Sequence, residues 1–187
     1  MSGGSIIVLA ILVFAGVTIF KGVRIVPQGY KWIVQRLGKY HTTLTPGLNF
    51  VIPYVDEVAY KVTTKDIVMD IPSQEVITRD NAVLLMNAMA YINITTPEKA
   101  VYGIENYTWA IQNLVQTSLR SIVGEMDLDD ALSSRDHIKA KLKAAISDDI
   151  SDWGITLKTV EIQDIQPSST MQSAMEAQAA AERQRRA

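Results

Sequence analysis

The chain begins with an uncharged apolar stretch that differs from everything after it. Residues 1–20 carry no charged side chain, and Ile6–Phe20 is apolar apart from Gly16 and Thr18. Twenty residues in a helix extend about 30 Å, the hydrocarbon thickness of a bilayer, although the apolar run by itself is shorter. The pattern predicts a transmembrane anchor over residues 1–22. Its anchoring side chains are predicted to be Ile6, Ile7, Leu9, Ile11, Leu12, Val13, Phe14, Ile19 and Phe20.

A cleaved signal peptide is the competing interpretation of this leader. Such a peptide carries basic residues before its apolar stretch and small residues at a cleavage site after it. No Lys or Arg precedes Lys21, and Gly22-Val23-Arg24 is a poor cleavage site. The sequence therefore favours an uncleaved anchor.

Residues 23–80 alternate in short stretches that predict strands and tight turns. Tyr30–Leu37 is rich in aromatic and β-branched residues, Gly38 ends it, and Lys39–Leu44 can return as its hairpin partner. A second, strongly apolar stretch runs from Leu48 to Val55. It predicts either a core strand followed by a bend or a loop inserted shallowly into a membrane. The candidates for insertion are Leu48, Phe50, Val51, Ile52, Pro53 and Tyr54.

Residues 81–166 mix strands with helices. Alternate positions of Ala82–Ile94 are apolar, which predicts a strand with one buried face. Thr96-Pro97 predicts the capped start of a short helix that runs to about Tyr102, and a longer helix follows Asn106 and ends at Gly124. A third helix is predicted to begin after Ser133-Ser134 and to end before Gly154, with Ile138, Leu142, Ala145 and Ile146 on one face. The apolar phase of Ile155–Ile165 shifts near Thr159, which predicts a β-bulge. The buried row of the first strand is predicted to be Leu84, Met86, Ala88, Ala90, Ile92 and Ile94.

The tail, residues 167–187, consists of strong helix formers. Ser169 and Gln172 fit a capping box at its start. One face is small and weakly apolar, so the helix needs a partner to be stable. We expect the beginning of a longer assembly helix, packed against other copies through Met171, Ala174, Met175, Gln178 and Ala181.

Charge orients the predicted anchor. Five basic residues follow it before the first acidic residue, Asp56: Lys21, Arg24, Lys31, Arg36 and Lys39. The positive-inside rule then places the body in the cytoplasm and the N-terminus outside, with the basic flank near anionic lipid headgroups. Residues 56–187 carry 13 basic and 20 acidic residues, and so acidic a body argues against nucleic-acid binding.

The sequence contains no recognisable catalytic, cofactor or metal site. There is no cysteine, and His41 and His137 lie in different predicted elements without metal-ligand spacing. The acidic residues of 125–130 lack the glycine and terminal glutamate of a calcium loop, which favours a solvated surface turn. No phosphate-binding or nucleophile-elbow motif occurs. The prediction is a non-enzymatic scaffold or interaction protein without a cofactor.

An ordered set of short motifs runs through the whole chain. In chain order these are Val26-Pro27-Gln28-Gly29-Tyr30, Arg36-Leu37-Gly38-Lys39-Tyr40, Thr45-Pro46-Gly47-Leu48, Val51-Ile52-Pro53, Asp70-Ile71-Pro72-Ser73-Gln74-Glu75-Val76-Ile77-Thr78-Arg79-Asp80-Asn81, Leu119-Arg120-Ser121-Ile122-Val123-Gly124 and Trp153-Gly154-Ile155. Each motif alone is weak, but the set resembles the SPFH family, also called the band 7 or prohibitin-homology family, and within it the bacterial stomatin-like branch.

The resemblance implies an α+β SPFH domain of antiparallel strands and helices over residues 23–166, strand-rich in 23–80 and mixed in 81–166. It further implies a scaffold in the bacterial inner (plasma) membrane whose copies assemble into a large ring or cage around a membrane microdomain. The implied partners are membrane lipid, other copies of the chain, and an FtsH-type membrane protease or an NfeD-type protein. The alternatives are a dedicated regulator of one membrane protease and a membrane-bound hydrolase.

Overall fold

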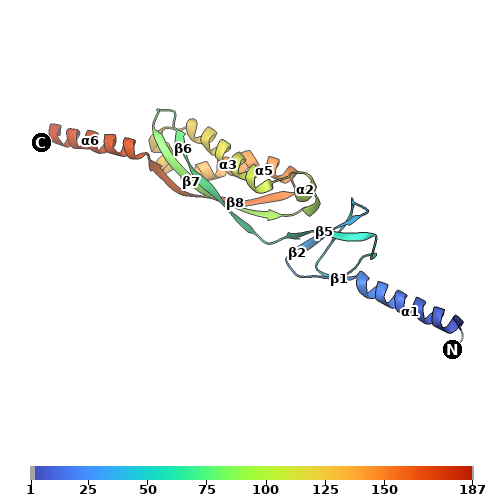
Figure 1. Cartoon of the computed structure of the whole chain (residues 1–187). Helices are drawn as coiled ribbons and strands as arrows, with labels where there is room; N and C mark the ends of the chain where they lie inside the picture. The colour runs from blue at the N-terminus through green and yellow to red at the C-terminus, as the bar shows by residue number, and fades with distance from the viewer. Residues whose placement is uncertain (1–2, 187) are drawn as a thin grey trace. The chain divides into compact units, whose positions relative to one another are not determined.

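The computed structural model describes residues 3–186, and their elements form two units (Figure 1). The first unit contains the chain up to Lys65 together with Ile94–Gly103. The second contains Asp66–Asn93 and the chain from Ile104 onward. Both units combine antiparallel strands with helices, as the α+β prediction requires.

The first element is an apolar helix, α1 (Gly3–Gly22). Its side chains from Ile6 to Phe20 are largely exposed, and the hydroxyl of Thr18 donates to the carbonyl oxygen of Phe14 at 2.8 Å. Within residues 3–186, none of the helices combines the length and apolar character that crossing a bilayer requires. The predicted transmembrane span is therefore not supported, because the fifteen residues Ile6–Phe20 rise only about 22 Å.

Two small antiparallel sheets follow α1 in the first unit. β1 (Val23–Val26) pairs with β4 (Gly47–Phe50), while β2 (Tyr30–Arg36) lies between β3 (Lys39–Leu44) and β5 (Asp56–Thr63). The predicted hairpin is thereby confirmed. Its two-residue turn holds Leu37 and Gly38 at φ values of 50° and 80°, the left-handed conformation that matches the twist of a tight hairpin.

The sheets of the first unit share a small core. Its buried side chains are Val26, Val34, Leu44 and Val51, and Tyr30, Trp32 and Val58 pack against them. A short helix, α2 (Pro97–Tyr102), returns to this unit from later in the chain. The ring of Tyr102 meets those of Tyr40 and Tyr60 edge-on, with centroids 6.0 and 5.9 Å apart, and its hydroxyl accepts from Gln35. Thr96 precedes α2 as predicted, but its side chain makes no capping hydrogen bond.

The second unit is a three-stranded sheet covered on one face. β7 (Val83–Ile94) lies between β6 (Ile67–Ile77) and β8 (Ile155–Pro167). The predicted alternation of β7 is confirmed, since all six side chains of the apolar row are buried. Two helices, α3 (Tyr107–Gly124) and α5 (Arg135–Asp152), pack against each other and against the sheet (Figure 1).

The helices follow the predicted spacing with one exception. Asn106 caps α3, because its side-chain oxygen accepts from the amide of Trp109 at 3.0 Å. The buried residues of α5 are Ile138, Leu142, Ile146 and Ile150. Ala145, predicted for this face, is exposed instead. The buried residues of α5 are spaced four apart, and Ala145 does not fall on that spacing.

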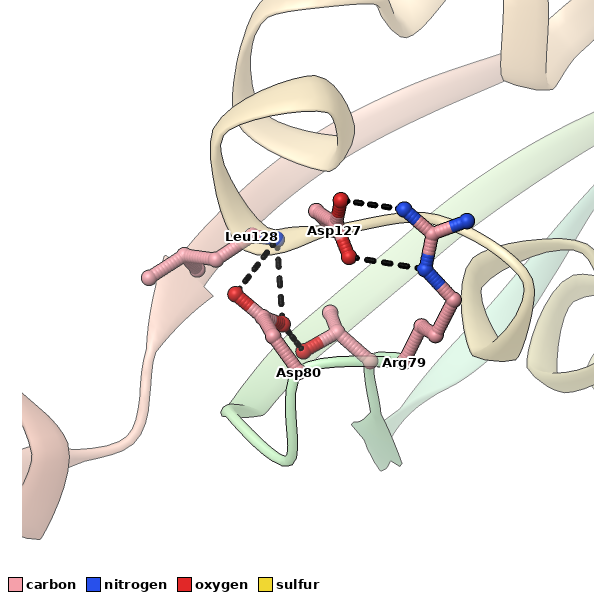
Figure 2. A network of polar contacts seen from close by, with 5 residues as sticks. Arg79, Asp80, Asp127 and Leu128 are labelled. Atoms are coloured by element: carbon pink, nitrogen blue, oxygen red, sulfur yellow. Dashed lines mark hydrogen bonds and ion pairs between the residues drawn. The ribbon is translucent and has the colours of Figure 1, made fainter.

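A short helix that the sequence did not reveal, α4 (Leu128–Ser133), begins inside the acidic cluster. Figure 2 shows what fixes its start: both carboxylate oxygens of Asp80 lie 3.2 Å from the amide nitrogen of Leu128, and Arg79 forms a two-point ion pair with Asp127. A hydrogen bond from the Thr78 hydroxyl lowers the pKa of Asp80. The predicted surface turn is confirmed for Glu125, whereas Asp129 and Asp130 lie in the first turn of a helix that Asp127 joins to the β6–β7 turn.

The last strand leads directly into the final helix, α6 (Ser169–Arg186). Burial in β8 changes parity as predicted, from Ile155 and Leu157 to Val160. The helix is confirmed, but the predicted capping box is wrong, because Met171 stands where the box needs Glu or Gln. Ser168 occupies the cap, and its hydroxyl oxygen accepts from the amide of Met171 at 3.3 Å.

Candidate membrane-contact site

Five large apolar side chains of the first unit remain exposed around β1 and β4. We name them the β4 patch: Ile25, Leu48, Phe50, Ile52 and Tyr54, each between 52% and 76% exposed. Ile25 and Leu48 are directly opposed in the β1–β4 ladder, so their side chains lie on the same face. That face is turned away from the core, which Val26 enters from the next position of β1. Apolar surface of this kind on a soluble unit marks a contact with another molecule or with lipid.

The end of α1 is joined to this patch. The amide of Val51 donates to the carbonyl oxygen of Gly22 at 2.8 Å. A Cβ atom on Gly22 would lie 2.8 Å from the Val51 carbonyl oxygen and 3.0 Å from the Phe50 ring, so only glycine permits this approach. The ammonium group of Lys21 lies 5.8 Å from the centre of the Tyr54 ring. The exposed apolar helix therefore ends against the exposed apolar patch.

The two predictions for Leu48–Val55 can now be compared. The core-strand prediction holds for Val51, which is buried, and for the pairing of β4 with β1. It is wrong for Leu48 and Phe50, which lie on the uncovered face of β4. The predicted bend is present at residues 53–55, and Ile52 and Tyr54 are exposed there. These side chains have the exposure that shallow insertion requires, while Pro53 is half-buried. Insertion itself stays a prediction.

The turn that carries Ile52 and Tyr54 is fixed by one carboxylate. Asp56 accepts from the amide of Ile52 at 2.9 Å, and from Arg36 through Nε at 2.7 Å and Nη2 at 3.0 Å. The Arg36 hydrogen bond, aided by the Ile52 amide and opposed by burial, lowers the pKa of Asp56 to about 2. Tyr54 is held at a φ of 74°, which a non-glycine residue adopts only when its surroundings enforce it. The patch is therefore a fixed surface.

The five basic residues of the predicted flank do not form one set. Lys21 and Arg24 are exposed beside the β4 patch, and Lys39 is exposed next to the β2–β3 turn. Lys31 is half-buried on β2. Arg36 departs most from the prediction, because its charge is neutralised by Asp56. Sequence reasoning missed Asp56, because it binds Arg36 from 20 positions away. It also missed Ile25, because only the pairing of β1 with β4 places this residue beside Leu48.

The predicted assembly face lies on a helix that is exposed along its length. Ala174, Met175, Gln178 and Ala181 are exposed, and Met171 is half-buried. An open groove of about 830 Å³ runs where α6 leaves β8. Its lining includes Gln172, Met175, Glu176, Ala179 and Arg183. Packing of this face against another copy stays a prediction.

Metal-ligating side chains are not gathered anywhere in the described part of the chain. Across residues 3–186, no three His, Asp or Glu side chains come close enough together to hold a metal ion. His41 lies on β3 of the first unit and His137 on α5 of the second.

An apolar N-terminal helix, followed by small antiparallel sheets and a helix-covered sheet, defines an α+β class of fold. The SPFH domain / Band 7 family matches residues 24–187, and the chain belongs to this family. The resemblance inferred from the ordered motifs is thus confirmed.

Relatives of the chain occur in bacteria, archaea and animals. An uncharacterized protein of Mycobacterium tuberculosis is 35% identical over 184 residues, which are 98% of this chain and 48% of that protein. An uncharacterized protein of Methanocaldococcus jannaschii is 41% identical over 169 residues, 90% of this chain and 84% of that protein. The human mitochondrial stomatin-like protein 2 is 38% identical over 162 residues, 87% of this chain and 46% of that protein. The chain thus spans about half the length of the mycobacterial and human relatives.

Proposed function

We propose that this chain is a non-enzymatic scaffold that attaches to a membrane through α1 and the β4 patch. The observation that supports the proposal best is their junction, where an exposed apolar helix ends against an exposed apolar surface. Burying one large apolar side chain stabilises a complex by roughly 1.5–3 kcal/mol. Several such side chains entering lipid together would hold the first unit at a bilayer.

The basic residues give the proposal a direction. Lys21 and Arg24 follow the apolar run of α1 directly. Although the apolar run of α1 is short for a span, we propose that α1 crosses the bilayer. Positive charge after it favours the cytoplasmic side, so we place the body in the cytoplasm of a bacterial cell and the N-terminus toward the outer side of the inner membrane.

We assign the assembly of copies to α6. Its exposed face supports packing against a second α6, and a closed ring or cage makes many modest contacts form together. Such a wall would enclose a membrane patch and organise the proteins within it, an FtsH-type protease or an NfeD-type protein among them.

Topology is testable with a single reporter, because the chain contains no cysteine. Ser2→Cys and the body control Ser73→Cys are each treated, in intact cells, with a maleimide that cannot cross membranes. The proposal predicts labelling at position 2 and protection at position 73 until the cells are opened. Labelling of position 73 in intact cells contradicts the orientation. Protection of both positions contradicts insertion of α1 across the bilayer.

Assembly and the absence of enzyme activity need separate measurements. Full-length protein extracted in mild detergent should run as a large particle with a ring or cage outline in electron micrographs, and a stable monomer or dimer contradicts the scaffold. The purified protein should not cleave peptide substrates. Turnover that a single Ser or Asp substitution abolishes would instead support the hydrolase.

A further inference from the structure

A pocket lies on the inner side of the β1–β4 pair, the face opposite to the β4 patch. It has a volume of about 430 Å³, within the usual range for small-molecule sites. Its lining is Arg24, Trp32, Val51, Asp56, Glu57, Val58 and Lys61, all within the first unit. We name it the Arg24 pocket.

The charges of this pocket leave it positive. Its buried carboxylate, Asp56, is already neutralised by Arg36. Glu57 also lines the pocket, but it opposes Gln35 in the β2–β5 ladder. The register shift between Ile33 and Val34 brings Lys61, the partner of Trp32, to the face of Val58 and Asp56. Arg24 and Lys61 therefore dominate the pocket. Among the described residues, neither of them has a carboxylate within ion-pair distance.

Lys61 is positioned by an aromatic ring. Its ammonium group lies 4.5 Å from the centre of the Trp32 ring, directly across the ladder between β2 and β5. This contact holds the side chain over the pocket without consuming its three hydrogen-bond donors. Arg24 supplies a planar fork suited to two oxygen atoms of a phosphate. Together they offer an anion two cations of complementary geometry.

The pocket and the β4 patch lie on opposite faces of the β1–β4 pair. Arg24 precedes Ile25 on β1 and Val51 follows Phe50, and successive strand residues point to opposite faces. Val51, Val58 and Trp32 give the pocket an apolar wall. A ligand that carries a phosphate next to hydrocarbon fits both the cations and this wall, whereas a free phosphate ion would leave the apolar wall uncovered.

We infer that the Arg24 pocket binds the phosphate group of one anionic membrane phospholipid, with Arg24 and Lys61 as its ligands. The inference rests on the proposed membrane attachment and adds to it a defined lipid site. Diffuse attraction of the basic flank to the membrane would treat all exposed lysines alike. Binding to a defined site depends instead on its two cationic residues, Arg24 and Lys61.

Two double variants separate these cases. Arg24→Gln/Lys61→Gln empties the pocket of positive charge, and Lys31→Gln/Lys39→Gln removes the same charge from the flank outside it. Binding of the full-length chain is measured by flotation with phosphatidylcholine vesicles, with and without phosphatidylglycerol. Retained phosphatidylglycerol is then counted by native mass spectrometry after detergent washing. Circular dichroism checks that each variant is folded, and Arg24→Lys tests whether charge at this position suffices.

The inference predicts that phosphatidylglycerol strengthens binding of the wild type and that one lipid survives washing. The pocket variant should lose about tenfold or more of this gain, the flank variant much less, and Arg24→Lys should retain most of it. Equal losses in both double variants, or no gain from phosphatidylglycerol, would overturn the pocket while leaving membrane attachment intact. Failure of the wild type to float with either vesicle would instead refute the proposed function.

Inorganic phosphate is the remaining candidate ligand for the pocket. Calorimetric titration of phosphate into the detergent-solubilised chain should give much weaker binding than phosphatidylglycerol, because phosphate leaves the apolar wall exposed. Equally tight binding of phosphate alone would show that the pocket binds a soluble anion and would overturn its assignment to a lipid.

Discussion

Arg36 and Asp56 form a two-point ion pair, with 2.7 Å between Nε and Oδ1 and 3.0 Å between Nη2 and Oδ2. The pair joins the end of β2 to the start of β5, and the same carboxylate accepts from the amide of Ile52. Asp56 therefore determines how the turn between β4 and β5 presents its apolar side chains.

Replacing Asp56 by Asn should loosen this turn. The substitution removes the charge that Arg36 and the Ile52 amide share, and leaves Arg36 without its partner. We expect the thermal midpoint to fall by a few degrees and membrane binding to weaken with it. Asp149→Asn is the control, since Asp149 is an exposed carboxylate on the surface of α5. Equal thermal midpoints for the two variants would contradict the assigned role.

Acid should weaken the same turn in a defined pH range. The pKa of Asp56 is lowered from 3.8 to about 2 in the folded chain. A lowered folded pKa adds stability that is fully present above the unfolded value and is lost as the pH falls toward the folded value. Stability should therefore drop between about pH 4 and pH 2. Thermal melts across this range should show a smaller drop in Asp56→Asn, and an identical pH profile would count against the prediction.

A charge placed on the β4 patch should impair membrane binding without unfolding the chain. Ile52→Glu and Ile77→Glu form a matched pair, because the two isoleucines are 52% and 56% exposed and belong to different units. Only Ile52 belongs to the patch. Vesicle flotation should fall about tenfold or more for Ile52→Glu, since a carboxylate must leave water to enter the bilayer. Similar losses for both variants would refute a specific patch.

The core of the second unit should be sensitive along one row of β7 only. Leu84 is fully buried, whereas its neighbour Leu85 is 37% exposed. Leu84→Ala should lower the free energy of unfolding by about 2–5 kcal/mol, because it removes buried methyl groups and leaves a cavity. Leu85→Ala should cost less than about 1 kcal/mol. Denaturant melts distinguish the two, and the reverse order would mean that the strand register is wrong.

Assembly should depend on one face of α6. Met175 is an exposed apolar residue on the proposed face, and Ser173 lies nearly opposite on the same helix. Met175→Lys should reduce the detergent-extracted particle to small species, because a cation would be buried between helices. Ser173→Lys should leave the particle large. Size-exclusion chromatography with light scattering measures both, and unchanged particles in Met175→Lys would remove this face from the interface.

Periodicity predicted the elements whose partners are close in sequence. The row from Leu84 to Ile94 and the buried face of α5 follow from spacing alone. Spacing also identified 48–55 as apolar, but it does not tell which face a strand of a two-stranded sheet leaves uncovered.

Contacts between distant residues account for what the sequence did not show. Arg36 looked like a free cation until folding placed Asp56 beside it, 20 positions away. The start of α4 was hidden because its supports, Arg79 and Asp80, lie 48 positions before the atoms they contact. The transmembrane span was predicted from the uncharged residues 1–20, but the apolar run within them, Ile6–Phe20, is shorter.

The discontinuous first unit also bears on how the chain matures during synthesis. Tyr102 packs edge-on against Tyr40 and Tyr60, yet it leaves the ribosome only after the whole β6–β7 hairpin. A nascent chain that ends before Pro97 therefore cannot complete the fold of the first unit. Truncated chains should show this: β2 and β3 should yield to protease in fragments that lack α2 and resist it in fragments that contain α2. The first unit would thus be completed by α2, a segment that is synthesised between the two parts of the second unit.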